Sequence, residues 1–280
     1  MSIIGIDIGG TNIRAGLVEH SSITKLLSCK TPAQETELKV LETITSLIEK
    51  LMTHSVEAIG IGVPSIVDIK NGIVYDTMNI PSWKKVHLKS YIENLFKVPL
   101  LVNNDANCFV AGEKHFGKGR NHNSILGIVM GTGLGAGIII NNKLYEGLHC
   151  GAGEIGNIKY LNSNYEYYCS GQYFKGEYNI SGQKAFQDAT QGDLRAIEMF
   201  TRFGEHVGNM IQTALYAYDP ECIVLGGSLS NAYSLFQSSM KKTFEDFMFP
   251  KILSDIKIEV SELDNIAIYG AVSLYYNSVN

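Results

Sequence analysis

The sequence lacks several features that would mark a membrane protein or a nucleic-acid-binding protein. No uninterrupted apolar run approaches the roughly 20 residues of a bilayer-spanning helix, and no basic region precedes an apolar stretch near the N-terminus. Lys and Arg are not clustered and the formal net charge is -5, whereas binding to a nucleic-acid backbone needs clustered cations. We therefore expect neither a membrane nor a nucleic acid among the partners.

Cysteine is scarce and irregularly placed. The five cysteines are odd in number and widely scattered, which argues for free thiols in a reducing cytoplasm and against a disulfide framework. What is present is an ordinary globular composition of 280 residues, 45% of them hydrophobic and 18% charged. A chain of this length can bury a large core and form two lobes with a cleft between them.

The order of the predicted elements indicates an internally duplicated α/β fold. Two strands surround a glycine turn at residues 3–18, and the same pattern returns at residues 124–140. Apolar spacing predicts helices over 37–52, 88–96, 106–116, most of 183–218 and 266–276. Extended patterns predict strands over 58–63, 66–75, 100–102 and 222–225. We assign residues 1–106 with the C-terminal helix 266–280 to an N-terminal lobe, and residues 107–265 to a C-terminal lobe.

The glycine turns are candidate nucleotide-binding loops. Glycine lets backbone N–H groups approach phosphate oxygens, and threonine hydroxyls add donors. A tight hairpin also favours glycine, so two such turns with an acidic residue between them are more informative than one. A third glycine pair after an apolar run suits either adenine packing or a simple strand-to-helix turn. The candidates are Asp7, Gly9, Gly10, Thr11, Asn12, Gly131, Thr132, Gly133, Gly226 and Gly227.

Asp105 is the candidate catalytic base. It follows a short apolar strand and lies among Asn103, Asn104 and Asn107, whose amides can hold a hydroxylated ligand. In phosphoryl transfer the protein mainly positions groups, and one carboxylate takes the proton of the nucleophile. The same residues would also suit the N-terminal cap of the helix that follows. Both interpretations can hold together, because a helix N-terminus steadies a carboxylate.

As an ordered set, these motifs resemble the ROK family of repressors, open reading frames and sugar kinases. The set comprises Asp7-Ile8-Gly9-Gly10-Thr11, Asn104-Asp105-Ala106-Asn107, Gly131-Thr132-Gly133-Leu134-Gly135, Gly153-Glu154-Ile155-Gly156 and Leu225-Gly226-Gly227. The resemblance implies an actin-like (ribonuclease H-like) two-lobed fold that binds a sugar and MgATP, with Asp105 as the base. It also implies phosphate contacts from the first two glycine turns and an adenosine contact from the third. The substrate-binding positions it implies are Ser65, Asn79, Asn104, Asp105, Glu154, Asn157 and Glu177.

The sequence departs from the family at its zinc motif. Family members commonly carry a His where this chain has Asn157, and a cysteine cluster whose matching positions here are Tyr168, Ser170 and Lys175. The lone Cys169 falls between these positions, and one thiol with an amide cannot form a closed tetrahedral zinc site. We therefore predict no structural zinc and no other bound protein metal. We expect packing and hydrogen bonds of Tyr165, Tyr167, Tyr168 and Tyr173 to hold this loop instead.

Three interpretations of function follow from the resemblance. The first is a glucokinase-like enzyme acting on a hexose at its 6-hydroxyl, and the second is a kinase of N-acetylmannosamine or N-acetylglucosamine. The third is a sugar sensor without turnover, which the altered zinc positions keep open. A repressor is disfavoured because the chain begins directly on the first predicted strand, without a helix-turn-helix before it. The resemblance also suggests a homodimer.

Overall fold

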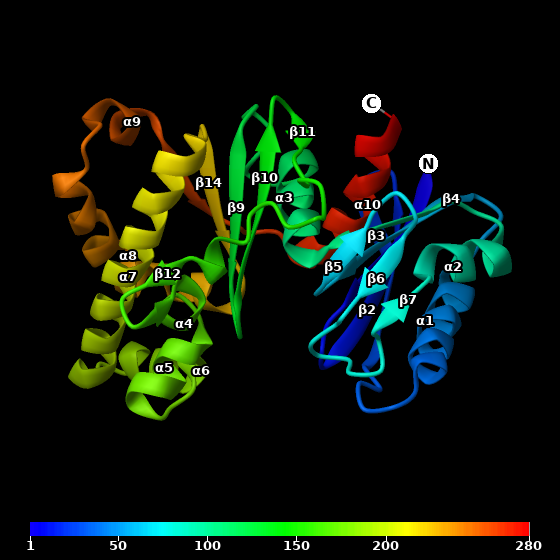
Figure 1. Ribbon diagram of the computed structural model, residues 1–280, viewed down its shortest axis with the longest axis horizontal. Helices are drawn as coiled ribbons and strands as arrows, with labels where there is room; N and C mark the ends of the chain where they lie inside the picture. The colour runs from blue at the N-terminus through cyan, green and yellow to red at the C-terminus, as the bar shows by residue number, and fades with distance from the viewer. Residues whose placement is uncertain (280) are drawn as a thin grey trace. The chain divides into compact units, whose positions relative to one another are not determined.

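A computed structural model describes residues 1–279 and shows two five-stranded sheets with the same layout (Figure 1). The first has the order β3-β2-β1-β4-β8 and the second the order β11-β10-β9-β14-β15. In each sheet the first strand pairs antiparallel with the strand that follows it, β1 with β2 and β9 with β10, and two further strands run parallel to that first strand. This shared order is the duplication that the sequence predicts.

The chain divides into two compact units. Unit 1 comprises residues 1–120, 142–152 and 263–280, and unit 2 comprises residues 121–141 and 153–262. The predicted lobe boundaries at residues 106 and 266 stay a prediction. No helix among the described residues combines the length and apolar character that crossing a membrane requires.

Unit 1 surrounds the first sheet with helices. The sheet consists of β1 (Ser2–Ile8), β2 (Asn12–Glu19), β3 (Ser22–Lys30), β4 (Val56–Val63) and β8 (Leu100–Asn104). A small three-stranded sheet consists of β5 (Ile66–Asp68), β6 (Ile73–Tyr75) and β7 (Lys85–Val86). The helices are α1 (Glu37–Leu51), α2 (Leu88–Phe96), α3 (Asp105–His115) and α10 (Ile266–Val279).

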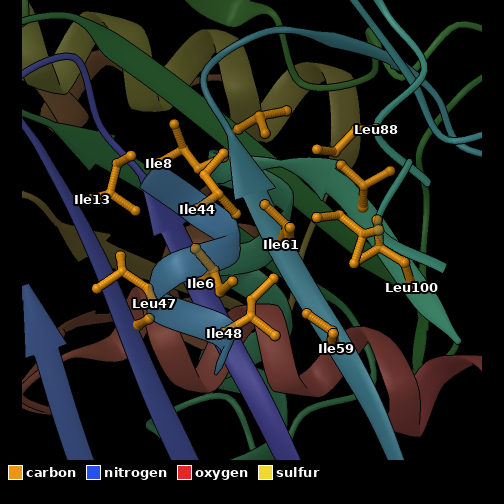
Figure 2. Packing of buried hydrophobic residues seen from close by; sticks show 14 of the residues in the cluster. Ile6, Ile8, Ile13, Ile44, Leu47, Ile48, Ile59, Ile61, Leu88 and Leu100 are labelled. Carbon is orange, nitrogen blue, oxygen red and sulfur yellow. The ribbon is translucent and has the colours of Figure 1, made fainter. Parts of the chain in front are cut away.

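The core of unit 1 is mainly aliphatic and lies on both faces of the sheet. On one face Ile44 and Ile48 of α1 pack against strand residues that include Ile6 and Ile61 (Figure 2). On the other face α10 packs so closely that a Cβ at Gly60 would lie 1.9 Å from the Ala271 carbonyl oxygen. Burial of such side chains contributes about 1.5–3 kcal/mol each. A sheet covered on both faces leaves its strand ends as the accessible positions for ligands.

Unit 2 joins the second sheet to a helical region. Its strands are β9 (Ile125–Met130), β10 (Leu134–Ile140), β14 (Cys222–Gly226) and β15 (Lys257–Val260), while the short strand β11 (Lys143–Leu144), next to β10 in the strand order, belongs to residues 142–152 of unit 1. The other elements are η1 (Ile155–Asn157), β12 (Lys159–Tyr160), β13 (Ser163–Asn164), α4 (Tyr165–Tyr168), α5 (Gly171–Tyr178), α6 (Gly182–Thr190), α7 (Leu194–Tyr218), η2 (Ser228–Ala232), α8 (Tyr233–Lys242), η3 (Thr243–Asp246) and α9 (Pro250–Asp255). The helices α7 and α8 lie side by side in Figure 1.

Most predicted elements are confirmed, and the differences have local causes. The predicted helix at 88–96 coincides with α2, and the predicted hairpin around Gly72 is β5–β6. The strand β3 was not predicted, because it lies at the sheet edge and its exposed side chains give no apolar alternation. The strand β15, also at an edge, was not predicted either.

Candidate active site

The carboxyl ends of three parallel strands meet at one edge of the unit 1 sheet. In the register of β1, β4 and β8, Asp7 lies beside Gly62 and Gly62 lies beside Asn103. The residues that follow these strand ends therefore emerge together, as ligand-binding residues do in open α/β sheets. They include Gly9 after β1, Ser65 after β4 and Asp105 after β8.

Asp105 is exposed at the first position of α3. Its Oδ1 accepts the backbone N–H of Ala106 at 2.8 Å. The helix cap itself is Asn104, whose Oδ1 accepts the same N–H at 2.9 Å. The cap is therefore supplied by Asn104, and the Asp105 carboxylate keeps an exposed position within the positive field of the helix N-terminus.

Asn104 and Ser65 are connected across the strand ends. The Asn104 Nδ2 donates to the Ser65 carbonyl at 3.3 Å, and the Ser65 hydroxyl donates to the Tyr75 carbonyl. Asn103 and Asn107, which we expected to contact a ligand, are both only 1% exposed and face the interior of the unit. Of the three asparagines near Asp105, Asn104 is therefore the one with a partly exposed side chain.

The first glycine turn lies against the loop that carries Asn79. The Gly9 N–H donates to the Asn12 carbonyl at 3.0 Å and closes the turn, and Thr31 Oγ1 donates to the Gly9 carbonyl at 2.6 Å. A Cβ at Gly10 would lie 2.8 Å from the Cβ of Asn79. The glycine thus allows the predicted phosphate turn and a predicted sugar-binding side chain to approach each other closely.

Asp7 is an acid in a largely desolvated position. Burial raises the pKa of Asp7 above its ordinary value, and the nearby charge of Arg14 lowers it in part. Burial raises the pKa of the Cys108 thiol, and the charges of Asp105 and Asp7 raise it further.

Unit 2 brings its two predicted glycine segments to one sheet edge. The strands β9 and β14 are parallel, with Val129 beside Gly226, so the 131–133 turn and the 226–227 pair leave the sheet together. Gly227 has a φ of +83°, and a Cβ there would lie 2.3 Å from the Met130 carbonyl oxygen. At Gly131 the nearest atom to a Cβ would be the Ser228 Oγ at 3.9 Å. Gly227 is thus required for packing, whereas a Cβ at Gly131 would make only an ordinary contact.

Glu154 and Asn157 form a pair at the short helix η1. The Asn157 Nδ2 donates to the Glu154 Oε2 at 2.9 Å, and both side chains are exposed. Gly153, at φ +91°, packs against the Ala136 carbonyl oxygen, where a Cβ would lie at 2.3 Å. This close backbone packing holds the Glu154–Asn157 pair at a defined place on β10.

Glu166 is a carboxylate beside the second glycine turn that the sequence motifs did not single out. Its Oε2 accepts the Leu134 N–H at 3.2 Å, and its Oε1 accepts the Gln172 amide at 2.9 Å. The same Oε2 would lie 2.8 Å from a Cβ at Gly133. Glu166 therefore lies against the second glycine turn. The capping residue Asn164, which accepts the Tyr167 N–H, is the one sequence signal that could have marked the short helix carrying it.

Glu177 contacts a residue outside the second glycine turn. It is exposed near the end of α5, where its Oε1 accepts the Tyr167 hydroxyl at 2.8 Å. Glu166 and Glu177 thus flank the segment that replaces the family's zinc motif. Of the two acids, Glu166 is the one in contact with the predicted phosphate turn.

Aromatic packing holds the segment between these two acids. The rings of Tyr168 and Tyr173 lie 4.8 and 5.2 Å from the His206 ring, and Tyr160 stacks on Tyr165 at 4.5 Å. The Tyr160 hydroxyl lies 3.2 Å from the His206 Nδ1, and burial raises the pKa of Tyr160 to about 12. The expected packing role of the tyrosines is confirmed, with Tyr160 and His206 as members that the sequence did not reveal.

The positions aligned with zinc ligands have other roles here. Tyr168 packs in the aromatic cluster, while Ser170 is buried and accepts the Gln172 N–H as the cap of α5. Lys175 is exposed on α5. Within residues 1–279, no group of three or more His, Cys, Asp or Glu side chains could hold a metal ion.

Comparison with known proteins places these features in a family. The ROK family matches residues 3–277. The chain belongs to the ROK family. It is 26% identical to a glucokinase of Thermotoga maritima over 98% of this chain and 97% of the relative. It is 31% identical to an N-acetyl-D-glucosamine kinase of Vibrio cholerae over 85% of this chain and 87% of the relative.

A solved structure of the family confirms the fold. The ROK family glucokinase from Streptomyces griseus, in complex with glucose and AMPPNP, superposes with a TM-score of 0.84. It is 28% identical and covers 98% of this chain and 99% of its own. The predicted family and the predicted actin-like duplicated α/β fold are thereby confirmed. The named relatives belong to the predicted enzyme class, the sugar kinases.

Proposed function

We propose that this chain transfers the γ-phosphoryl group of ATP to a hydroxyl of a hexose or hexose derivative, with Asp105 as general base. The observation that carries the proposal is the exposed Asp105 carboxylate at the N-terminus of α3, on the same sheet edge as the Gly9 turn. Glucose and N-acetyl-D-glucosamine kinases are both among the relatives. A glucokinase-like reaction at the 6-hydroxyl is our first choice, and an N-acetylhexosamine is the alternative substrate.

The proposed step needs a proton acceptor close to the attacking oxygen. The sugar oxygen forms a bond to the γ-phosphorus, the bond between that phosphorus and the departing ADP oxygen breaks, and the hydroxyl proton moves to the Asp105 carboxylate. The helix N-terminus stabilises the ionised form of this carboxylate. In such reactions the protein mainly supplies positioning and charge neutralisation.

The remaining predicted residues divide between sugar and nucleotide. In unit 1, Ser65, Asn79 and Asn104 supply hydroxyl and amide groups for sugar hydroxyls. In unit 2, the Glu154–Asn157 pair supplies an amide and a carboxylate, and the carboxylate can accept hydrogen bonds from two sugar hydroxyls. Asn157 stands at the position of the family's His, and its hydrogen bond to Glu154 orients the carboxylate.

The nucleotide contacts are proposed from the glycine turns of both units. The Gly131 N–H closes the turn 131–133 by donating to the Gly133 carbonyl at 2.9 Å, so the backbone N–H groups of Thr132 and Gly133 are those proposed for phosphate oxygens. The Gly226–Gly227 pair suits the adenosine part. Mg²⁺ prefers carboxylate and phosphate oxygens, and the Asp7 carboxylate near the end of β1 is the residue that would hold it. Bound Mg²⁺ would neutralise phosphate charge.

Glu166 and Glu177 are competing candidates for the second acid of unit 2. Glu177 matches the family motif by sequence, but its described partner is the Tyr167 hydroxyl. Glu166 contacts the Leu134 N–H at the glycine turn. A Cβ at Gly156, in the segment after Glu154, would lie 3.4 Å from the Glu166 Cβ. This proximity to the Glu154 segment favours Glu166 as the acid that contacts the substrate.

The decisive experiment measures ADP release from MgATP across a panel of hexoses and N-acetylhexosamines. Wild type should turn over one sugar, and Asp105→Asn should lower kcat on the order of 10²–10⁴-fold, because the nearly isosteric amide cannot accept the proton. The matched control is Asp255→Asn, which removes an exposed ion pair with Lys251 on α9 and should leave kcat unchanged.

Each outcome of this experiment has a distinct meaning. Turnover of a plain hexose supports the first choice, and turnover only of an N-acetylhexosamine supports the alternative. A folded wild type that binds a sugar tightly without releasing ADP would instead identify a sugar sensor. An active Asp105→Asn variant would contradict the assignment of the base.

A further inference from the structure

Asn103 is a buried amide whose carbonyl oxygen holds the chain on both sides of Asp105. Its Oδ1 accepts the backbone N–H of Asn104 at 2.8 Å and the Asn107 Nδ2 at 3.0 Å. Asn104 precedes Asp105, and Asn107 lies in the first turn of α3. One acceptor atom therefore fixes the backbone before the proposed base and the helical turn after it.

The other contacts of Asn103 come from a segment much later in the chain. Its Nδ2 donates to the Glu146 Oε1 at 2.7 Å across 43 positions, and the Cys150 thiol donates to its Oδ1 at 3.2 Å. Glu146 and Cys150 both belong to residues 142–152 of unit 1. This single side chain thus connects residues 142–152 to the start of α3.

The conformation of residues 142–152 places the Glu146 carboxylate and the Cys150 thiol beside Asn103. Cys150 is 4% exposed and has a φ of +57°, a conformation that is uncommon for any residue except glycine. Burial raises the pKa of the Cys150 thiol, which keeps it protonated and able to donate. Burial also raises the pKa of the half-buried Glu146, while the hydrogen bond from Asn103 lowers it. The Ala152 N–H closes the segment by donating to the Glu146 carbonyl at 3.2 Å.

Breaking this hydrogen-bond network would leave several buried polar groups without partners. A buried amide that loses a hydrogen-bond partner cannot replace it with water, and the oxygen of Asn103 accepts from three groups at once. Movement of Asn103 would release the Asn104 N–H and the Asn107 side chain together. Both changes shift the backbone that carries Asp105, and small misplacements of a catalytic group can lower rates by about 100-fold.

We propose that Asn103 is a positioning residue for Asp105, and that it couples residues 142–152 to the first turn of α3. This inference rests on the proposed function, since it takes Asp105 to be the base. Asn103 is too deeply buried to touch a substrate. Asn103 therefore acts on the orientation of Asp105. The segment 142–152, to which Asn103 is coupled, ends two positions before Glu154.

The test exchanges donor and acceptor between Asn103 and Glu146. Asn103→Asp keeps the shape and the Oδ1 acceptor, but it replaces the donor with a carboxylate oxygen facing the Glu146 Oε1. We expect kcat to fall about 10–100-fold with the KM for ATP unchanged. Adding Glu146→Gln supplies an amide donor to the new carboxylate, so kcat should recover to within about threefold of wild type. Glu146→Gln alone retains an acceptor oxygen and serves as the matched control.

A second measurement keeps the result independent of catalysis. Backbone amide hydrogen exchange should rise together at residues 103–107 and 144–152 in Asn103→Asp and return to wild-type rates in the double variant. If Asn103→Asp does not fold, Glu146→Ala removes the same hydrogen bond without a second carboxylate and should give the same paired increase. Absence of recovery in the double variant, or exchange that changes in one segment alone, would overturn the proposal. A wild type without sugar-dependent ADP release would refute the proposed function, while the exchange result would still decide the coupling.

Discussion

The two sheets of this protein share one strand order but carry different chemistry at their carboxyl edges. The next-to-last residue along the first strand of the unit 1 meander is Asp7, and its counterpart in unit 2 is Val129. In unit 1 the outer parallel strand β8 is followed directly by Asp105. In unit 2 the equivalent strand β15 is followed by Ser261, whose N–H donates to the Leu225 carbonyl.

This difference separates what the scaffold contributes from what the side chains contribute. The shared strand order places turns at the sheet edge in both units. Unit 1 fills that edge with carboxylates, which suit a proton acceptor and a metal-bound phosphate. Unit 2 fills it with Gly131, Thr132, Gly226 and Gly227, which suit backbone contacts to a nucleotide. Function thus depends on residues placed on a duplicated fold, since the fold alone does not determine it.

Among the tests of this comparison, substitutions of the unit 2 glycines should give the largest change in the free energy of unfolding. Gly227→Ala should destabilise the protein by about 2–4 kcal/mol, because an alanine at φ +83° is strained and its Cβ overlaps the Met130 carbonyl oxygen. Gly131→Ala should keep wild-type stability, since its Cβ would make only an ordinary contact with the Ser228 Oγ at 3.9 Å, but it should raise the KM for ATP because Gly131 lies in the proposed phosphate turn. Denaturant unfolding and ATP kinetics on both variants check this, and a stable Gly227→Ala would contradict the packing role.

The glycine turns also show why much of the fold was predictable from sequence. Turn residues and helix spacing act locally, so the β1–β2 hairpin, α1 and α2 could be read from a few neighbouring residues. The shared strand–turn–strand pattern likewise predicted the duplication. Local reasoning placed Asp105 at a helix start, although it did not assign the cap to Asn104.

The inward-facing asparagines could not be predicted in the same way. Asn103 and Asn107 look like ligand-binding residues because they flank Asp105, and their burial depends on Glu146 and Cys150, more than 40 positions away. Glu166 was missed for a similar reason, since its contact with Leu134 spans 32 positions. Such contacts arise only when distant segments pack together.

The two acids of unit 2 provide the next test. Glu166→Gln should lower kcat/KM for the sugar about 10–100-fold, because an amide accepts hydrogen bonds from sugar hydroxyls more weakly than a carboxylate does. Glu177→Gln should change this value by less than about threefold, since its partner is a surface tyrosine hydroxyl. Steady-state kinetics with the preferred sugar distinguish the two. A larger effect from Glu177→Gln would restore the acid that the sequence motif indicated.

The smallest expected effect concerns the cores of the two units. Unit 1 has an aliphatic core around Ile44 and Ile48, whereas residues 160–173 of unit 2 pack on the ring of His206. The His206 ring contacts the rings of Tyr160, Tyr168 and Tyr173, and it also lies in the field of the Glu177 charge. Burial lowers the pKa of His206 below its ordinary value of 6.5, and Glu177 opposes this in part. The folded state therefore favours the neutral ring, and the unfolded chain binds the proton more readily. This contribution to stability is complete above pH 6.5 and is lost as the pH falls from there toward the folded-state pKa.

His206→Gln should reduce the acid-induced fall in Tm by no more than about 2–4 °C, while the exposed His54→Gln should leave that fall unchanged. Thermal unfolding between neutral and mildly acidic pH measures both, and equal curves for wild type and His206→Gln would show that the aromatic cluster does not sense the proton.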